Sequence, residues 1–323
     1  MAKIKLKKKP IFITLALLIV FSVVVYTGVK IKKNIDYKKT YEYKLEKMEY
    51  SKEDAALLIE KLDSKELDKI LELEYYDVIP KLVGEKYYLH KNLDDYLAYH
   101  EKNNCAKEDQ NCLKNIIAVI NVGADKEWYT GFVSADTSKG TLMLINKFHR
   151  LEESYSPDDL VDVLNWYAYG NNPKLKEEAY ESFISMFNAA KDDKMNIYMN
   201  SPYRTFGQQE KLYNDYKLWY GQASADTYSA RPGFSEHQTG LAIDIGTYGA
   251  TMETFDTFAE SAWLQENAHK FGFILRYPKE KEFITGYIYE PWHYRYVGIE
   301  VATYIYQNKI TFDEYYAFYI EGK

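Results

Sequence analysis

Hydrophobic and polar positions divide the chain into an apolar N-terminal segment, a helical region and a longer mixed region. Residues 11–29 form a run of 19 positions without a charge. A bilayer core about 30 Å thick requires roughly 20 helical residues, so this run predicts a transmembrane helix. Five lysines precede the run and three follow it, which favours an N-terminus inside the cell. We therefore expect a cytoplasmic tail over residues 1–9 and a single-pass membrane anchor over residues 10–29.

A cleaved signal peptide is the competing interpretation of this segment. Such a peptide would combine a shorter apolar stretch with a cleavage site of small residues. The sequence Val25-Tyr26-Thr27-Gly28-Val29-Lys30 fits that kind of site poorly. Under either interpretation, the chain after residue 30 lies outside the cytoplasm.

The next two regions are polar and then helical in pattern. Residues 30–49 are highly charged and lack apolar periodicity, as expected of a stalk. Residues 50–115 show helical spacing of apolar positions after the capping residues Ser51 and Ser64, and again near residues 92–99. We expect a small helical region there, with a spacer or docking role.

Strand-like and helical patterns alternate over residues 116–323, and they predict an α+β domain with a small antiparallel sheet flanked by helices. Strands are expected at 116–123, 141–148, 196–204, 241–245 and 273–276. Helices are expected at 157–168, 172–192, 208–219 and 254–270.

Composition narrows the class of protein without indicating a reaction. Hydrophobic residues make up 46% of the 323 positions, enough for a sizeable core. The formal net charge of −7 gives no reason to expect a nucleic-acid partner, because phosphate-binding surfaces carry a basic excess. Cys105 and Cys112 lie in a polar stretch, where a local disulfide and two free thiols are both open.

His237 and Asp244 are the first candidates for chemistry. They stand seven residues apart, with Gly240 between them and an apolar run leading into the aspartate. If the glycine lets the chain fold back, the imidazole and the carboxylate can converge, and both are good zinc ligands. On spacing alone, a loop histidine and a capping or salt-bridged aspartate remain the simpler interpretation.

His293 adds a third nitrogen ligand, and Glu290 stands three residues before it. Three protein ligands and a water characterise a catalytic rather than a structural zinc. The metal would lower the pKa of that water, and Glu290 could accept its proton. The alternative is that Glu290 is an ordinary surface acid. Trp292 is interpreted as a core aromatic residue.

Several linked motifs together carry a family resemblance. They are Ser201-Pro202-Tyr203-Arg204 with Gln209, residues 230–237 ending in Ser235-Glu236-His237, residues 240–244 ending in Asp244, and residues 290–293. In this order and spacing they resemble the VanY-type D-alanyl-D-alanine carboxypeptidase family. That family belongs to the LAS group of zinc metallopeptidases, with lysostaphin-like enzymes and the hedgehog signalling domain. The resemblance covers roughly residues 117–310.

By position, the resemblance implies that His237, Asp244 and His293 bind zinc (Zn2+). It also implies that Glu290 is the catalytic base. The anchor and the helical region lie outside the part of the chain that it covers.

The resemblance assigns Arg204, Gln209 and Ser235 to the substrate. Arg204 matches an arginine that steadies charge on the scissile carbonyl, a task that suits a guanidinium because it stays charged and donates in a fixed fork. Where the family often has Ser-Gly-Tyr-Arg-Ser, this chain has a proline at position 202. Pro202 restricts the backbone beside the arginine.

The resemblance implies a zinc-dependent carboxypeptidase that removes a terminal D-alanine from peptidoglycan stem peptides outside the cell membrane. An L,D-carboxypeptidase and a peptidoglycan endopeptidase remain open, because no motif here reports the pocket walls that choose the bond. A metal-containing wall-binding module is the non-enzymatic alternative. Arg204 and Glu290 argue against it, since a binding module needs neither.

Overall fold

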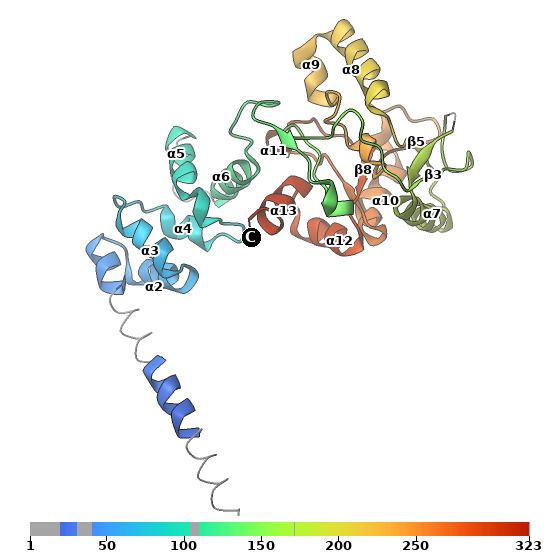
Figure 1. Ribbon diagram of the computed structural model, residues 1–323. Helices are drawn as coiled ribbons and strands as arrows, with labels where there is room; N and C mark the ends of the chain where they lie inside the picture. The colour runs from blue at the N-terminus through green and yellow to red at the C-terminus, as the bar shows by residue number, and fades with distance from the viewer. Residues whose placement is uncertain (1–19, 31–40, 104–109, 171, 323) are drawn as a thin grey trace, which may run out of the picture. The chain divides into compact units, whose positions relative to one another are not determined.

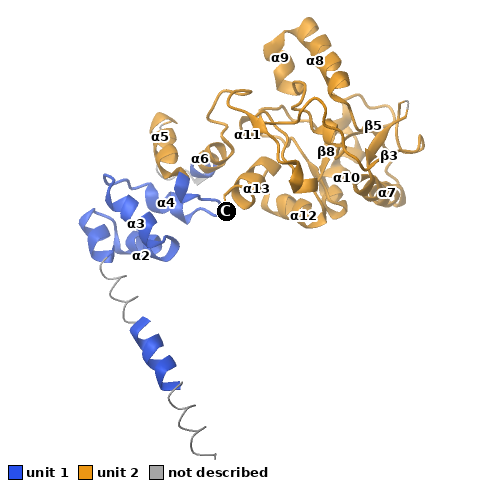
Figure 2. Cartoon of the chain, in the orientation of Figure 1, with its two compact units in different colours: residues 1–91, 104–114 blue, residues 92–103, 115–323 orange. Residues whose placement is uncertain are grey.

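The computed structural model describes residues 20–30, 41–103, 110–170 and 172–322 (Figure 1). The chain divides into two compact units (Figure 2). The first contains residues 1–91 and 104–114, and the second contains residues 92–103 and 115–323.

Helices α2 (Lys52–Lys61), α3 (Ser64–Leu71) and α4 (Ile79–Gly84) belong to the first unit. The Ser51 side chain accepts a hydrogen bond from the backbone of Asp54, and Asp63 forms a capping box with Glu66. These caps satisfy backbone N–H groups that have no partner inside the helix. Helices that begin near residues 51 and 64 are therefore confirmed.

The predicted membrane anchor falls only partly on described residues. Residues 20–30 are helical and exposed. Within the described ranges, no helix has both the length and the apolar character needed to cross a membrane. Residues 10–19 lie outside the described residues, so the anchor stays a prediction.

Of the two cysteines, Cys112 is disulfide-bonded. Cys105 lies outside the described residues.

A four-stranded antiparallel sheet lies at the centre of the second unit. Its strands are β5 (Ile197–Ser201), β6 (Ala242–Thr247), β8 (His293–Tyr296) and β7 (Phe273–Leu275), in that order across the sheet. Two smaller sheets pair β1 (Val133–Ser134) with β2 (His149–Arg150) and β3 (Leu160–Asp162) with β4 (Lys174–Lys176).

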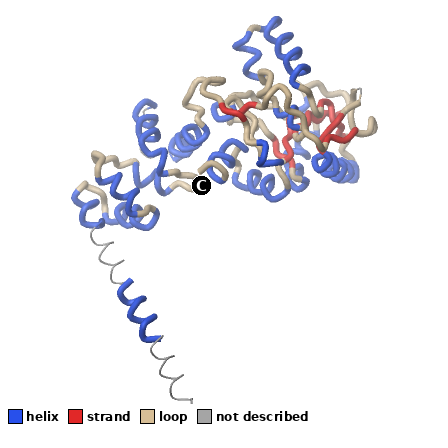
Figure 3. The backbone as a smooth tube through the Cα atoms, viewed as in Figure 1, coloured by secondary structure: helices blue, strands red, loops and turns tan. Residues whose placement is uncertain are grey.

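Helices flank these sheets, as Figure 3 shows. They are α7 (Glu177–Asp192), α8 (Phe206–Tyr220), α9 (Gln222–Tyr228), α10 (Ala259–Asn267), α11 (Glu282–Thr285), α12 (Ile299–Asn308) and α13 (Phe312–Tyr319). Helices α5 (Leu93–Asn103) and α6 (Gln110–Val122) come earlier in the chain, and the boundary between the two units falls within α6. Short 3-10 turns lie at His90–Asn92, Thr137–Leu142, Glu236–Thr239, Phe255–Thr257 and Ala268–Phe271. The prediction of an α+β fold with a small sheet flanked by helices is confirmed.

One apolar core joins α7 to the central sheet. The helix contributes a stripe with helical spacing, Ala179, Phe183, Met186 and Ala190. Ile243 and Ile245 of β6 and Tyr294 of β8 belong to the same core. Because successive side chains of a strand point to opposite faces, the alternate residues Asp244 and His293 are turned to the other face of the sheet.

Three sequence predictions about secondary structure were wrong. The apolar run at 116–123 belongs to helix α6, because a short buried run has no periodicity that separates a strand from a helix. Residues 157–168 form strand β3 and turns instead of a helix, since residues 160–162 pair with β4. Residues 141–148 form no strand: the first two end the 3-10 turn Thr137–Leu142, residues 143–145 have no regular secondary structure, and Asn146 makes an isolated bridge to His149.

Candidate metal centre and active site

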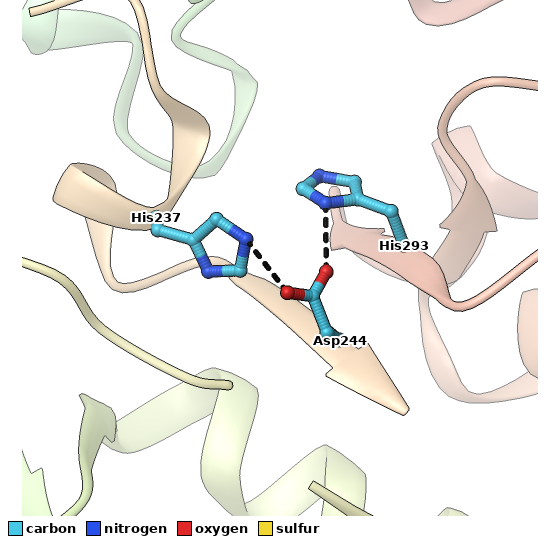
Figure 4. A group of neighbouring side chains, drawn as sticks. All are labelled: His237, Asp244 and His293. Atoms are coloured by element: carbon cyan, nitrogen blue, oxygen red, sulfur yellow. Dashed lines mark hydrogen bonds and ion pairs between the residues drawn. The ribbon is translucent and has the colours of Figure 1, made fainter. Parts of the chain in front are cut away.

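His237, Asp244 and His293 meet at one point, as Figure 4 shows. One ligand atom from each lies within 4.8 Å of the other two, and all three residues are buried. Asp244 Oδ2 lies 3.4 Å from His237 Nε2, and Asp244 Oδ1 lies 3.1 Å from His293 Nδ1.

Sheet register and one turn produce this convergence. Asp244 on β6 is paired directly with His293 on β8, and side chains directly opposite on antiparallel strands are close neighbours. His237 lies in the 3-10 turn Glu236–Thr239, which ends at Gly240 with a φ of 66°. A side chain at position 240 would have its Cβ 2.8 Å from Leu160. Glycine therefore permits both the left-handed backbone and the close approach that return the chain to β6.

The chemistry of the three donors fits zinc. Imidazole and carboxylate bind zinc at roughly 2.0–2.2 Å, so ligand atoms around a tetrahedral ion lie about 3.3 Å apart. The separations of 3.4 and 3.1 Å agree with that spacing. Burial raises the pKa of Asp244, but the neighbouring imidazoles of His237 and His293 outweigh the effect of burial and hold that pKa well below the usual range. The aspartate is therefore ionised, as an anionic zinc ligand has to be.

His237 is held by the backbone of the neighbouring loop. Its Nδ1 lies 2.8 Å from the carbonyl oxygen of Pro202. A carbonyl only accepts, so Nδ1 carries the proton, and in the neutral ring the lone pair of Nε2 is left for a metal ion. The proline that departs from the family pattern therefore lies beside a metal ligand, and its carbonyl orients the ring.

Glu290 is buried beside the three candidate ligands, three residues before His293 at the start of β8. Its Oε2 lies 3.8 Å from His293 Nδ1. Burial raises the pKa of Glu290 to about 8, although the charges of His293 and Arg204 act against the rise. A carboxyl group whose pKa lies near neutrality is suited to accept and return a proton during one reaction cycle.

Arg204 lies near Asp244, in the loop between β5 and α8. Its guanidinium donates to Gln209 Oε1 at 2.6 Å and to Ser201 Oγ at 2.8 Å, and it lies 3.8 Å from Asp244 Oδ2. Gln209 in turn donates to the carbonyl of Ala230 at 2.6 Å. Gln209 was predicted to contact substrate, and in this structure it orients the arginine.

The predicted residues share one cavity of about 430 Å³. The lining includes the three candidate ligands with Arg204, Gln209, Ser235 and Glu290. Tyrosines 216, 220 and 228 of α8 and α9 form part of the same wall, and their rings contact one another. All seven residues singled out from the sequence therefore lie around the same space.

Sequence reasoning missed Glu236. This residue is fully buried, and its Oε2 lies 3.3 Å from His293 Nε2. Burial raises its pKa, but the charges of Arg276 and Arg295 lower it well below the usual range. Its position next to His237 in the motif could have indicated that it lies at the site. A charged residue inside an otherwise buried turn needs a partner.

Comparisons with known proteins agree with this geometry. A family model described as VanY, D-alanyl-D-alanine carboxypeptidase, matches residues 172–299. The putative carboxypeptidase YodJ of Bacillus subtilis (strain 168) is 38% identical over 192 residues, which cover 58% of this chain and 70% of that protein. A D-alanyl-D-alanine carboxypeptidase of Enterococcus faecalis (strain ATCC 700802 / V583) is 35% identical over 189 residues, covering 56% of this chain and 67% of that protein.

Among solved structures, the LdcB LD-carboxypeptidase is 37% identical to this chain, with a TM-score of 0.55. The match covers 58% of this chain and 91% of LdcB. The residues that the family model matches, 172–299, contain all four strands of the central sheet and the loops that bring the buried histidines and carboxylates together. The chain belongs to the VanY-type D-alanyl-D-alanine carboxypeptidase family of metallopeptidases.

Proposed function

We propose that this chain is a zinc-dependent carboxypeptidase that removes a terminal D-alanine from peptidoglycan stem peptides. The observation that carries the proposal is the convergence of His237, Asp244 and His293 on one point, with Glu290 and Arg204 in the same cavity. The two curated relatives described above are named as carboxypeptidases, and one is named for D-alanyl-D-alanine.

His237 Nε2, Asp244 and His293 Nδ1 would hold the zinc ion. When bound, zinc supplies a Lewis acid that polarises a carbonyl and lowers the pKa of water. Glu290 accepts the proton of the attacking water and passes it to the departing amine, so a single carboxylate serves both halves of the hydrolysis. Arg204 donates to the oxygen on which negative charge develops.

Replacing Arg204 with lysine should lower kcat/KM by about 100- to 1000-fold, because one aligned donor to a developing oxyanion is worth that much. Lysine keeps the charge but cannot donate to Gln209, Ser201 and substrate in one plane. Steady-state release of D-alanine measures the effect. Replacing the exposed Lys211 with arginine serves as the control, and it should leave kcat/KM unchanged. A fully active Arg204→Lys enzyme would contradict the role.

The bond that the enzyme cuts is tested with defined muropeptides. We expect release of D-alanine from a pentapeptide that ends in D-Ala-D-Ala, read by mass spectrometry. Preferential cleavage of a tetrapeptide would establish an L,D-carboxypeptidase instead, the alternative that similarity to LdcB favours. Cleavage within a cross-link would establish an endopeptidase. Binding of muropeptides without cleavage would leave a wall-binding module.

We also propose that residues 10–29 anchor the enzyme in the cell membrane, with the catalytic domain outside. The run of 19 uncharged residues at 11–29 and the preceding lysines support this placement. The full chain should sediment with membranes, resist a high-salt wash and dissolve only in detergent. In intact cells lacking a wall, added protease should reach the catalytic domain. Recovery of the chain in the soluble fraction would contradict the anchor.

A further inference from the structure

The buried carboxylate of Glu236 has a separate partner for each of its oxygens. Oε1 accepts hydrogen bonds from Arg276 Nε and from an Arg295 guanidinium nitrogen, each at 2.8 Å. Oε2 lies 3.3 Å from His293 Nε2. The side chains of Glu236 and of both arginines have no exposed surface. Water therefore cannot replace any of these contacts.

We propose that Glu236 is a positioning residue that holds His293 in the tautomer able to bind the metal. This inference rests on the metal site of the proposed function. An ionised carboxylate only accepts hydrogen bonds, so the ring nitrogen facing Glu236 must carry the proton. A neutral His293 then has its free lone pair on Nδ1, which faces Asp244 Oδ1 at 3.1 Å. Carboxylates that accept from a metal-bound histidine orient the ring and increase its basicity.

The two arginines prevent Glu236 from turning away. Arg276 also binds Asp313 of α13, at 2.5 and 3.3 Å. Arg295 also donates to the carbonyls of Thr141 and Met143, at 2.9 and 2.8 Å. The two buried guanidinium groups, of Arg276 and Arg295, are thus balanced by two buried carboxylates, of Glu236 and Asp313. Replacing one partner of such a group leaves a buried charge uncompensated.

This arrangement links the C-terminal helix to the metal site. Asp313 lies in the first turn of α13 and also accepts from Asn146 at 2.8 Å. The chain of contacts runs from Asp313 through Arg276 and Glu236 to His293. These contacts explain why the segments near residues 141–146 and 313 are buried against the site, although they supply none of the proposed metal ligands.

The test is Glu236→Gln, which keeps the size of the side chain and removes its charge. The arginines only donate, so the amide oxygen should stay with them and the amide nitrogen should face His293. His293 must then accept at Nε2, which places its proton on Nδ1 and blocks the metal. We expect the zinc Kd, measured by competition with a chromogenic chelator, to rise about 10- to 100-fold. Glu178→Gln, which alters only an exposed partner of Tyr296, is the control and should keep the wild-type Kd.

Nitrogen-15 NMR of the imidazoles in the zinc-loaded wild-type protein gives a second measurement. A purely structural role of Glu236 would not determine which ring nitrogen of His293 carries the proton. His293 should carry its proton on Nε2, and His237 should carry its proton on Nδ1. A proton on His293 Nδ1, or a wild-type Kd in Glu236→Gln, would overturn the inference. If that variant fails to fold, the wild-type spectrum still decides. A wild-type chain that binds no zinc would overturn the proposed function itself.

Discussion

Replacing Glu290 with glutamine should reduce kcat by about 1000-fold or more while zinc remains bound, since general acid–base catalysis contributes roughly 100- to 10,000-fold. Glutamine has nearly the same shape, but its amide cannot accept a proton from water or return one to the departing amine. The proposed metal ligands His237, Asp244 and His293 are untouched by the change. Release of D-alanine from a pentapeptide and zinc content per chain are the two measurements.

Both measurements are needed, because Glu290 lies close to a metal ligand. Its Oε2 is 3.8 Å from His293 Nδ1, so a loss of activity together with a loss of zinc would show a structural role. Glu282→Gln makes the same chemical change at an exposed position of α11 and should keep full activity. An active Glu290→Gln enzyme with its zinc in place would refute the assignment of the base.

Replacing Asp244 with asparagine should abolish stoichiometric zinc binding and reduce activity to background. Asp244 is the proposed anionic ligand, and it lies between the two imidazoles and near Arg204. A neutral amide is a poorer zinc ligand, and it leaves the buried positive charges of the site without their partner. Activity, zinc content and Tm should be measured for wild type and variant, before and after chelation.

Chelation separates loss of the metal from loss of the fold. Removing zinc from the wild-type protein should abolish activity, and adding zinc back should restore it. At zinc concentrations 100-fold above Kd the bound ion stabilises the fold by about 2.7 kcal/mol, a rise in Tm of roughly 5–10 °C. Asp244→Asn should show no such rise, whereas Asp162→Asn, at an exposed ion pair, should respond like wild type. Full activity of the chelated wild-type enzyme would contradict metal catalysis.

Local sequence signals predicted several elements near the site well. The helix predicted at 208–219 was confirmed as Phe206–Tyr220, and the structure shows that Thr205 and Gln208 form a capping box at its start. The apolar run leading into Asp244 predicted β6, and the glycine expected to let the chain fold back is Gly240, with positive φ. Such runs and turn residues depend on neighbours within a few residues, so they can be recognised without the fold.

Long-range pairing decided the elements that were mispredicted. The carbonyls of Thr141 and Met143 accept from the buried Arg295, more than 150 residues away, so a run that is apolar enough for a strand makes no regular ladder. Residues 160–162 pair with β4 rather than continuing the helix suggested by Ser156 and Pro157. These partners are distant in sequence, and local pattern alone does not report them.

The donor types and their order along the chain can be read from the residues alone, because imidazole and carboxylate chemistry belongs to the side chains of His237, Asp244, Glu290 and His293. Which nitrogen of each histidine is free cannot be read in this way. That choice depends on the Pro202 carbonyl for one ring and on the Glu236 carboxylate for the other. Both acceptors reach their ring only through folding, 35 and 57 residues away along the chain. The hydrogen-bond acceptor that faces each ring sets its tautomer, and only the folded chain brings that acceptor to the ring.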